Sequence, residues 1–233
     1  MRLRTLSTSL TAVAAACLIT APAFASQQDQ PGYYISARTV YARQQANNMD
    51  LSLRPRIGSF VSGKDSAQRF TGALAAGYQF GNGWRAEGEY TARTTSAFTS
   101  GSTAFPTSFN HDRIASRRFM LNGYRDIALG QGFSAYASLG IGIANAQSGG
   151  WQGNPSRPFN RSTQNNLTYA VGAGVSYAPA KQWAVDLGYR YVDMGQVHSG
   201  WNAFPNASGL QDEQMKANLA ANEIYLGVRF LFD

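Results

Sequence analysis

Charged residues recur at even spacings along this chain, and arginine is interleaved with glutamate among them. In "RAEGEYTAR", Arg85, Glu87, Glu89 and Arg93 are separated by even numbers of positions, so a β-strand would place them on one face. Reading the other strand-like segments in the same way gives ten charged residues for one shared interior: Arg38, Arg85, Glu87, Glu89, Arg93, Arg118, Asp186, Arg190, Glu223 and Arg229. Because an unpaired buried charge is costly, we expect these residues to form a network of ion pairs.

Patterns for catalysis or metal binding are weak. The sequence has two histidines, His111 and His198, and "HSG" at 198–200 offers a histidine beside a serine. A hydrolytic triad also needs an orienting acid and an oxyanion site, and Asp193 or Asp212 would supply the acid only by a coincidence of folding. No His-x-x-x-His, Cys-x-x-Cys or Asp-rich calcium loop occurs. The sequence therefore predicts no enzyme, no metal site and no cofactor.

Eight segments with alternating apolar residues are available to position these charges. They cover roughly 33–43, 69–80, 84–95, 113–128, 133–146, 166–178, 183–195 and 217–232. Three connections are tight ("GNG" at 81–83, "GQG" at 130–132 and "PAKQ" at 179–182), and four are long, at about 44–68, 96–112, 147–165 and 196–216. An even strand number with alternating short and long connections is typical of a bacterial outer-membrane barrel. We predict an all-β fold: an eight-stranded antiparallel transmembrane β-barrel with short periplasmic turns and four long extracellular loops.

The alternation by itself fits two kinds of fold. Segment 133–146 puts Phe133, Leu139 and Ile143 on one face and small residues such as Gly140 on the other. A soluble sandwich buries its apolar face, whereas a membrane barrel turns that face to lipid. The export signal, the connection lengths and the aromatic residues near strand ends favour the barrel. The last segment then pairs with the first, because lipid leaves no sheet edge unpaired.

The first 25 residues predict export. They combine a basic start (Arg2 and Arg4), an apolar middle and a final Ala-Phe-Ala, as in a Sec signal peptide cleaved after Ala25. Residues 26–233 would form the single mature domain, without the lone cysteine, Cys17, and without any run of about 20 apolar residues that could span a membrane as a helix. The formal charge of +7 falls to +5 without the two arginines, and the basic residues are spread along the chain, so a nucleic-acid partner is not expected.

The interior supports two interpretations. An eight-stranded barrel is just wide enough for side chains to fill it, and small inward residues such as Gly140, Gly142 and Gly172 leave room for long charged ones. The first interpretation is a satisfied polar plug that fixes register and rigidity. The second is a narrow conduit that favours anions, because six arginines face four acids in the predicted set.

The long loops combine aromatic and basic residues with Ser, Gly and Asn. Their aromatic residues are Phe98, Phe105, Phe109, Trp151, Phe159, Trp201 and Phe204, and their cations are Arg54, Arg56, Lys64, Arg157 and Arg161. Such composition resembles that of binding loops, although these rings could equally pack against one another or against the barrel rim. Arginine also binds phosphate well. The candidate contact residues are Phe105, Trp151, Arg157, Arg161 and Trp201.

Three stretches carry a family resemblance. "GALAAGYQFGNGWRAEGEY", "VGAGVSYAPAKQWAVDLGYRYVDMG" and "IYLGVRFLF" resemble the opacity-type (Opa) outer-membrane porin family and related eight-stranded outer-membrane β-barrel domains. The resemblance implies a barrel whose loops often bind host or surface partners. The C-terminal segment also looks like the signal read by the barrel assembly machinery, with Tyr225, Phe230 and Phe232 as its aromatic residues. Asp233 follows the usual final aromatic position, which is a departure from that pattern.

Two functions remain open at this point. The first is a structural or adhesive protein of the cell outer membrane whose loops contact lipopolysaccharide, a host receptor or a glycan. The second is a small diffusion porin that conducts solutes through the lumen. Either would be embedded in outer-membrane lipid, and we expect a monomer.

Overall fold

The computed structural model describes residues 31–51 and 59–232, and in this part the chain is all-β. Its strands are β1 (Gly32–Leu51), β2 (Phe60–Ser62), β3 (Ser66–Gln79), β4 (Trp84–Ser102), β5 (Asn110–Gly130), β6 (Phe133–Gln152), β7 (Pro158–Ala180), β8 (Trp183–His198) and β9 (Met215–Leu231). No helix in the described residues could span a membrane. The predicted signal peptide, its cleavage site, Arg54, Arg56 and Asp233 lie outside the described residues.

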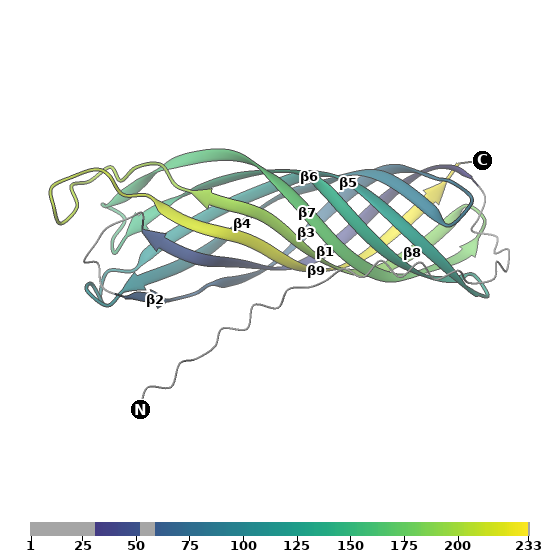
Figure 1. Cartoon of the computed structure of the whole chain (residues 1–233), viewed down its shortest axis with the longest axis horizontal. Coiled ribbons are helices and arrows are strands. Elements are labelled where there is room, and N and C mark those ends of the chain that lie inside the picture. The colour runs from purple at the N-terminus through teal and green to yellow at the C-terminus, as the bar shows by residue number, and fades with distance from the viewer. Residues whose placement is uncertain (1–30, 52–58, 233) are drawn as a thin grey trace, which may run out of the picture.

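Eight of these strands close into a ring (Figure 1). All the pairs are antiparallel, and β9 pairs with β1 from Tyr34↔Leu231 to Leu51↔Met215. The apolar last strand therefore joins the first, as expected for a barrel without a free edge. The short strand β2 pairs only with the end of β4, at Ser100–Ser102.

The eight predicted strands are all present, but most of them are longer than predicted. β7 begins at Pro158, where the sequence pattern placed a loop up to residue 165, and it runs for 23 residues. A strand of that length measures about 75 Å, whereas about 9–11 residues suffice to cross a membrane. A large part of the barrel therefore stands outside the lipid, and Figure 1 shows the resulting elongated shape.

The outer wall is apolar only near the end that carries the tight turns. Large apolar side chains point outward there, for example Leu139 and Leu167, the latter 68% exposed. Farther along β6 and β7 the outward positions become polar, with Asn145, Gln147 and Asn165. We call the apolar region the lipid band and the remainder the upper barrel.

The inside of the upper barrel is mainly apolar, although it also buries polar residues such as Gln44, Asp112 and Ser148. One cluster of buried residues occupies much of it and extends down into the lipid band: Ala46, Met49, Ala67, Phe98, Ile114, Met120, Ala144, Ala146, Ala170, Val192, Met194, Val197, Ala217, Leu219 and Ala221. Polarity therefore changes along the barrel as a whole. The barrel is polar inside and apolar outside within the lipid band, whereas above it the outside is polar and the inside is mainly apolar.

Candidate functional site

The interior of the lipid band holds a charge network in three tiers. In the lowest tier, Arg229 donates to Asp186 at 3.3 Å and to the hydroxyl of Ser176 at 3.1 Å. Beside this pair, Arg85 binds Asp126 through two hydrogen bonds of 2.6 and 2.8 Å. Both arginines are almost fully buried, so their charges depend on these partners.

The middle tier is built around Glu87. Arg38 donates to its two carboxylate oxygens at 2.5 and 2.8 Å. The hydroxyls of Tyr34 and Tyr124 donate to the same carboxylate at 3.0 and 2.6 Å, and the amide of Asn122 adds a bond of 3.2 Å. Five donor contacts from two strands, β1 and β5, therefore satisfy one carboxylate of β4.

The upper tier links two glutamates through Arg190. This guanidinium donates to Glu89 at 2.8 and 2.9 Å and to Glu223 at 2.7 Å. Arg118 also donates to Glu223, at 2.6 Å, and Arg38 also donates to Glu89. Arg38 thus joins the middle and upper tiers, which contain charges from β1, β4, β5, β8 and β9. The lower tier adjoins them through Arg85, which lies 4.4 Å from the ring centroid of Tyr124.

The network balances its charges. It contains five arginines and five carboxylates: Arg38, Arg85, Arg118, Arg190 and Arg229 with Glu87, Glu89, Asp126, Asp186 and Glu223. Asp126 was not among the residues predicted to face the interior, although it lies at even spacing from Arg118 and Asn122 and so shares their face. The predicted excess of arginine is therefore absent from this network.

Arg93 was predicted to face the interior, and this prediction is wrong. Its side chain is exposed on the outer wall, where it donates to the amide oxygen of Asn145 at 2.8 Å. The cause is a register shift of the β4–β5 pair between Thr91 and Thr94. Such a bulge adds a residue and reverses the alternation beyond it.

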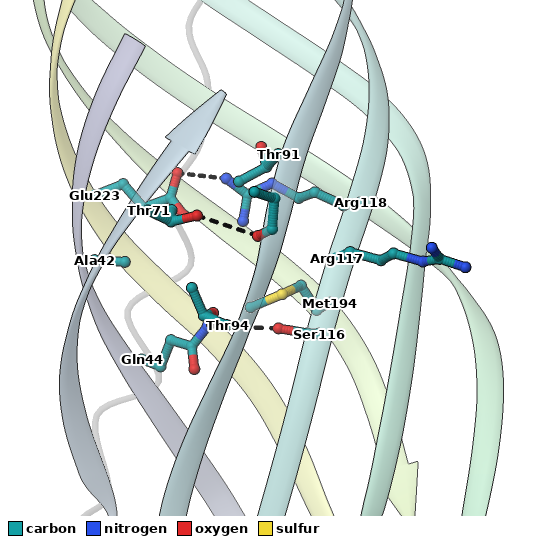
Figure 2. A pocket seen from close by; sticks show the side chains of 11 residues that line it. Ala42, Gln44, Thr71, Thr91, Thr94, Ser116, Arg117, Arg118, Met194 and Glu223 are labelled. Carbon is teal, nitrogen blue, oxygen red and sulfur yellow. Dashed lines mark hydrogen bonds and ion pairs between the residues drawn. The ribbon is translucent and has the colours of Figure 1, made fainter. Parts of the chain in front are cut away.

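The apolar core of the upper barrel lies above the network. Phe98, predicted as a loop aromatic, is 0% exposed within this core. Where network and core meet, a cavity of about 10 Å³ is lined by residues that include Gln44, Met194 and Glu223 (Figure 2). Its volume suits about one water molecule.

The outer end of the upper barrel holds a buried acid without a cationic partner in the described residues. Asp112 accepts a hydrogen bond of 2.7 Å from the hydroxyl of Ser148. Burial raises the pKa of Asp112 to about 6, although the bonds from Ser148 and from the backbone of Gly149 favour its charged form. Asp112 lies outside the lipid band, because it is seven residues farther along β5 than Phe119, which belongs to that band.

The predicted contact residues have different surroundings. Phe105 and Trp201 are 44% and 52% exposed in loops. Trp151 lies in β6 and stacks on His111 at 5.1 Å. Arg157 lies over the ring of Phe204 at 4.5 Å, and Arg161 is exposed in β7.

Two other predicted loop aromatics are buried. Phe159 and Phe204 pack edge to face at 5.5 Å. They form a small cluster with Met215 at the outer end of the barrel. The alternative that loop rings pack against one another therefore applies to this pair.

The predicted assembly residues are divided between the two faces of β9. Phe230 and Phe232 contact each other at 5.3 Å, and Phe230 also contacts Trp183 at 4.9 Å. Tyr225 points the other way, into the barrel, where its hydroxyl bonds that of Tyr136 at 2.9 Å.

A model of the outer membrane protein beta-barrel domain matches residues 11–232. The chain belongs to this family. The match confirms the predicted fold class and the resemblance to eight-stranded outer-membrane barrels, and it places this family member in the cell outer membrane.

Relatives of this outer-membrane barrel include the outer membrane protein PagN of Salmonella typhimurium. The two are 27% identical over 129 residues, which is 52% of each protein, so the match spans about half the length of that relative. Among solved structures, Neisserial surface protein A has a TM-score of 0.53 at 20% identity, covering 87% of this chain and 99% of that one. The outer membrane protein OprG of Pseudomonas aeruginosa has a TM-score of 0.61 at 13% identity, covering 88% and 98%. The two structural matches establish a shared fold.

Proposed function

We propose that this protein is a non-conducting surface protein whose upper barrel and loops contact lipopolysaccharide or a host ligand. The observation that carries the proposal is the filled interior. A balanced charge network occupies the lipid band, and an apolar core lies directly above it. A hydrated diffusion path would have to disrupt both, and desolvated ions are costly in an apolar core.

The upper barrel gives the proposal its second support. It raises the loop ends away from the lipid and presents exposed rings such as Phe105 and Trp201. Arg161 adds an exposed cation on the wall of the same end. Aromatic and arginine side chains are enriched in binding surfaces, so this end is the proposed contact region.

Catalysis is not part of this proposal. The hydroxyl of Ser199, beside His198, donates to the carbonyl of Gly200 at 2.8 Å and accepts from the backbone N–H of Met215 at 2.9 Å. Ser199 is fully buried. Its hydroxyl supports the loop and has no access to a substrate.

Planar-bilayer recording tests the closed lumen. We expect the purified protein to give no steady conductance. Reproducible channels that vanish on Arg190→Gln would favour the diffusion porin and overturn the proposal.

Binding of protein-displaying bacteria to cultured host cells and to immobilised acidic polysaccharide tests the surface role. Deleting 147–165 would remove parts of β6 and β7, so point variants are preferable. We expect Trp201→Ala to reduce binding, while Trp84→Ala serves as the control, since Trp84 is a similarly exposed tryptophan at the opposite end of the barrel. Equal binding by the two variants would contradict the assignment of the contact region.

Export and assembly complete the proposal. We expect a mature chain that begins at Ser26, which N-terminal sequencing would show. The aromatic surface of Phe230 and Phe232 is proposed to engage the assembly machinery, and Phe232→Ala should lower the amount of folded protein in the outer membrane. Within the described residues the eight-stranded ring closes through β1 and β9, and only the three-residue strand β2 has a free edge, which supports a monomer.

A further inference from the structure

Four exposed arginines gather on the outer wall formed by β4, β5, β6 and β7. They are Arg93, Arg113, Arg117 and Arg161. Arg117 is paired in register with Asn145, and Arg93 reaches the same asparagine from β4. Higher on the wall, Arg113 is paired with Gly149, which the side chain of Arg161 covers from the other side. The four therefore form a lower pair and an upper pair.

The lower pair lies at the boundary of the lipid band. Phe119 is paired with Ile143, and Ile143 with Leu167, so these three form an apolar row across the wall. Arg117 and Asn145 are the next outward residues above that row. A side chain at this height meets the headgroups of the outer leaflet. Figure 2 shows Arg117 pointing away from the interior cavity, in contrast to Arg118.

In the part of the chain that the structure describes, no carboxylate of this wall pairs with the four arginines. The four strands contain four acidic residues, Glu87, Glu89, Asp112 and Asp126. Glu87, Glu89 and Asp112 are buried inside the barrel, and Asp126 binds Arg85. Among the described residues, Arg93 contacts an amide, and Arg113 lies 5.2 Å from the ring centroid of Trp151. Their charge is available to an external anion.

We propose that Arg93, Arg117 and Asn145 bind a phosphate group of the phosphorylated glycolipid of the outer leaflet. Guanidinium groups suit phosphate oxygens because they donate paired hydrogen bonds in a fixed plane. The upper pair lies about 13 Å farther along the strands, because Arg113 is four residues from Arg117 on β5. The saccharide of the same glycolipid continues at this height. The inference rests on the proposed lipopolysaccharide contact and narrows it to one face of the wall.

The bulge in β4 supports this assignment. Without the register shift between Thr91 and Thr94, Arg93 would keep the inward direction that the alternation predicts. The bulge therefore adds a second arginine beside Arg117 at headgroup height. Bulges commonly redirect a side chain toward a functional site.

Native mass spectrometry from a neutral detergent, with diphosphoryl lipid A as the added ligand, tests the inference. We expect the full-length mature protein to bind this lipid, and Arg93→Gln with Arg117→Gln to weaken binding about tenfold or more, since two charge-assisted contacts are lost. Arg43→Gln is the matched control, because Arg43 is an exposed arginine on β1, just above the apolar residue Tyr41 and away from this wall. It should change the affinity by less than about twofold.

Two further lipids, measured in the same assay, identify the ligand. Lipid A without phosphates and phosphatidylglycerol should both bind at least about tenfold more weakly than diphosphoryl lipid A, because each lacks part of the phosphorylated glycolipid. Equal affinity of the double variant and the wild type would overturn the proposal, as would equal affinity for phosphatidylglycerol or an equal loss in the control. Heat-modifiable gel mobility confirms that each variant is folded. Host-cell binding by the same variants tests the loop contacts separately. If the lipid A site were refuted, the proposed contact of the loops with a host ligand would still stand.

Discussion

Replacing Glu89 by glutamine should destabilise the barrel strongly, although the two side chains have the same shape. Glu89 is 0% exposed and lies between Arg38 and Arg190, with a further bond of 3.0 Å from the hydroxyl of Thr91. Glutamine would leave five guanidinium groups with four carboxylates. Because both arginines keep a second acid, we expect the free energy of unfolding to fall by about 3 kcal/mol, the lower end of the range for breaking a buried ion pair.

Urea unfolding of the protein folded into lipid vesicles, followed by tryptophan fluorescence and gel mobility, measures this loss. With a slope of about 1–3 kcal/mol per molar urea, the midpoint should move by about 1 M or more. Arg43→Gln, an exposed charge, should remain within about 0.5 kcal/mol. Adding Arg190→Met to Glu89→Gln removes an arginine that has lost a partner, so the double variant should lose less stability than the two single variants combined. A wild-type midpoint for Glu89→Gln, or strictly additive losses, would refute the network argument.

Three further perturbations address other parts of the barrel, each read out by the same unfolding assay. The pKa of Asp112 is higher in the folded state than in the unfolded state, so the free energy of unfolding of the wild type should rise as the pH falls from 7.5 toward 4. Asp112→Asn should abolish that rise and should be more stable than the wild type at pH 7.5 by up to about 3 kcal/mol. A pH profile of the variant that matches the wild type would contradict this. Gly188→Ala should lower the free energy of unfolding by at least about 2 kcal/mol, because its Cβ would lie 2.4 Å from a buried tyrosine hydroxyl. Gly123→Ala, whose Cβ would have no atom within 4 Å, should be nearly neutral. An equally small loss for both variants would show that the buried side chains can move to accommodate the methyl group. Phe98→Ala should cost about 3–5 kcal/mol by leaving a cavity, and Phe105→Ala less than about 1 kcal/mol, so the reverse order would argue against the upper core.

The period-two pattern was sufficient to predict the number of strands and the side to which most residues point. Arg38, Glu87 and Arg229 were placed correctly because the alternation holds through the lipid band of their strands. It failed at Arg93 because a register shift depends on how β4 pairs with β5, which single-strand periodicity does not contain.

The length of the upper barrel could not be predicted from the same pattern. The sequence pattern treats polar outward residues as loop residues, yet Arg161 and Trp151 lie in strands that continue beyond the lipid. Inside that region the alternating residues are often small, such as Ala144 and Ala146, which lowers the contrast between the two faces. Sequence composition could also not separate Phe98, which is buried, from Phe105, which is exposed.

The change of polarity along the barrel divides the protein into a membrane anchor and a stalk that share one hydrogen-bonded wall. Because side chains alternate with a period of two, inserting two residues into each arm of a hairpin in the stalk would preserve which residues face inward. The reach of the loops beyond the cell surface can therefore lengthen or shorten while the ion-paired anchor stays the same. Changing the stalk length alone would therefore change how far the loops stand from the lipid.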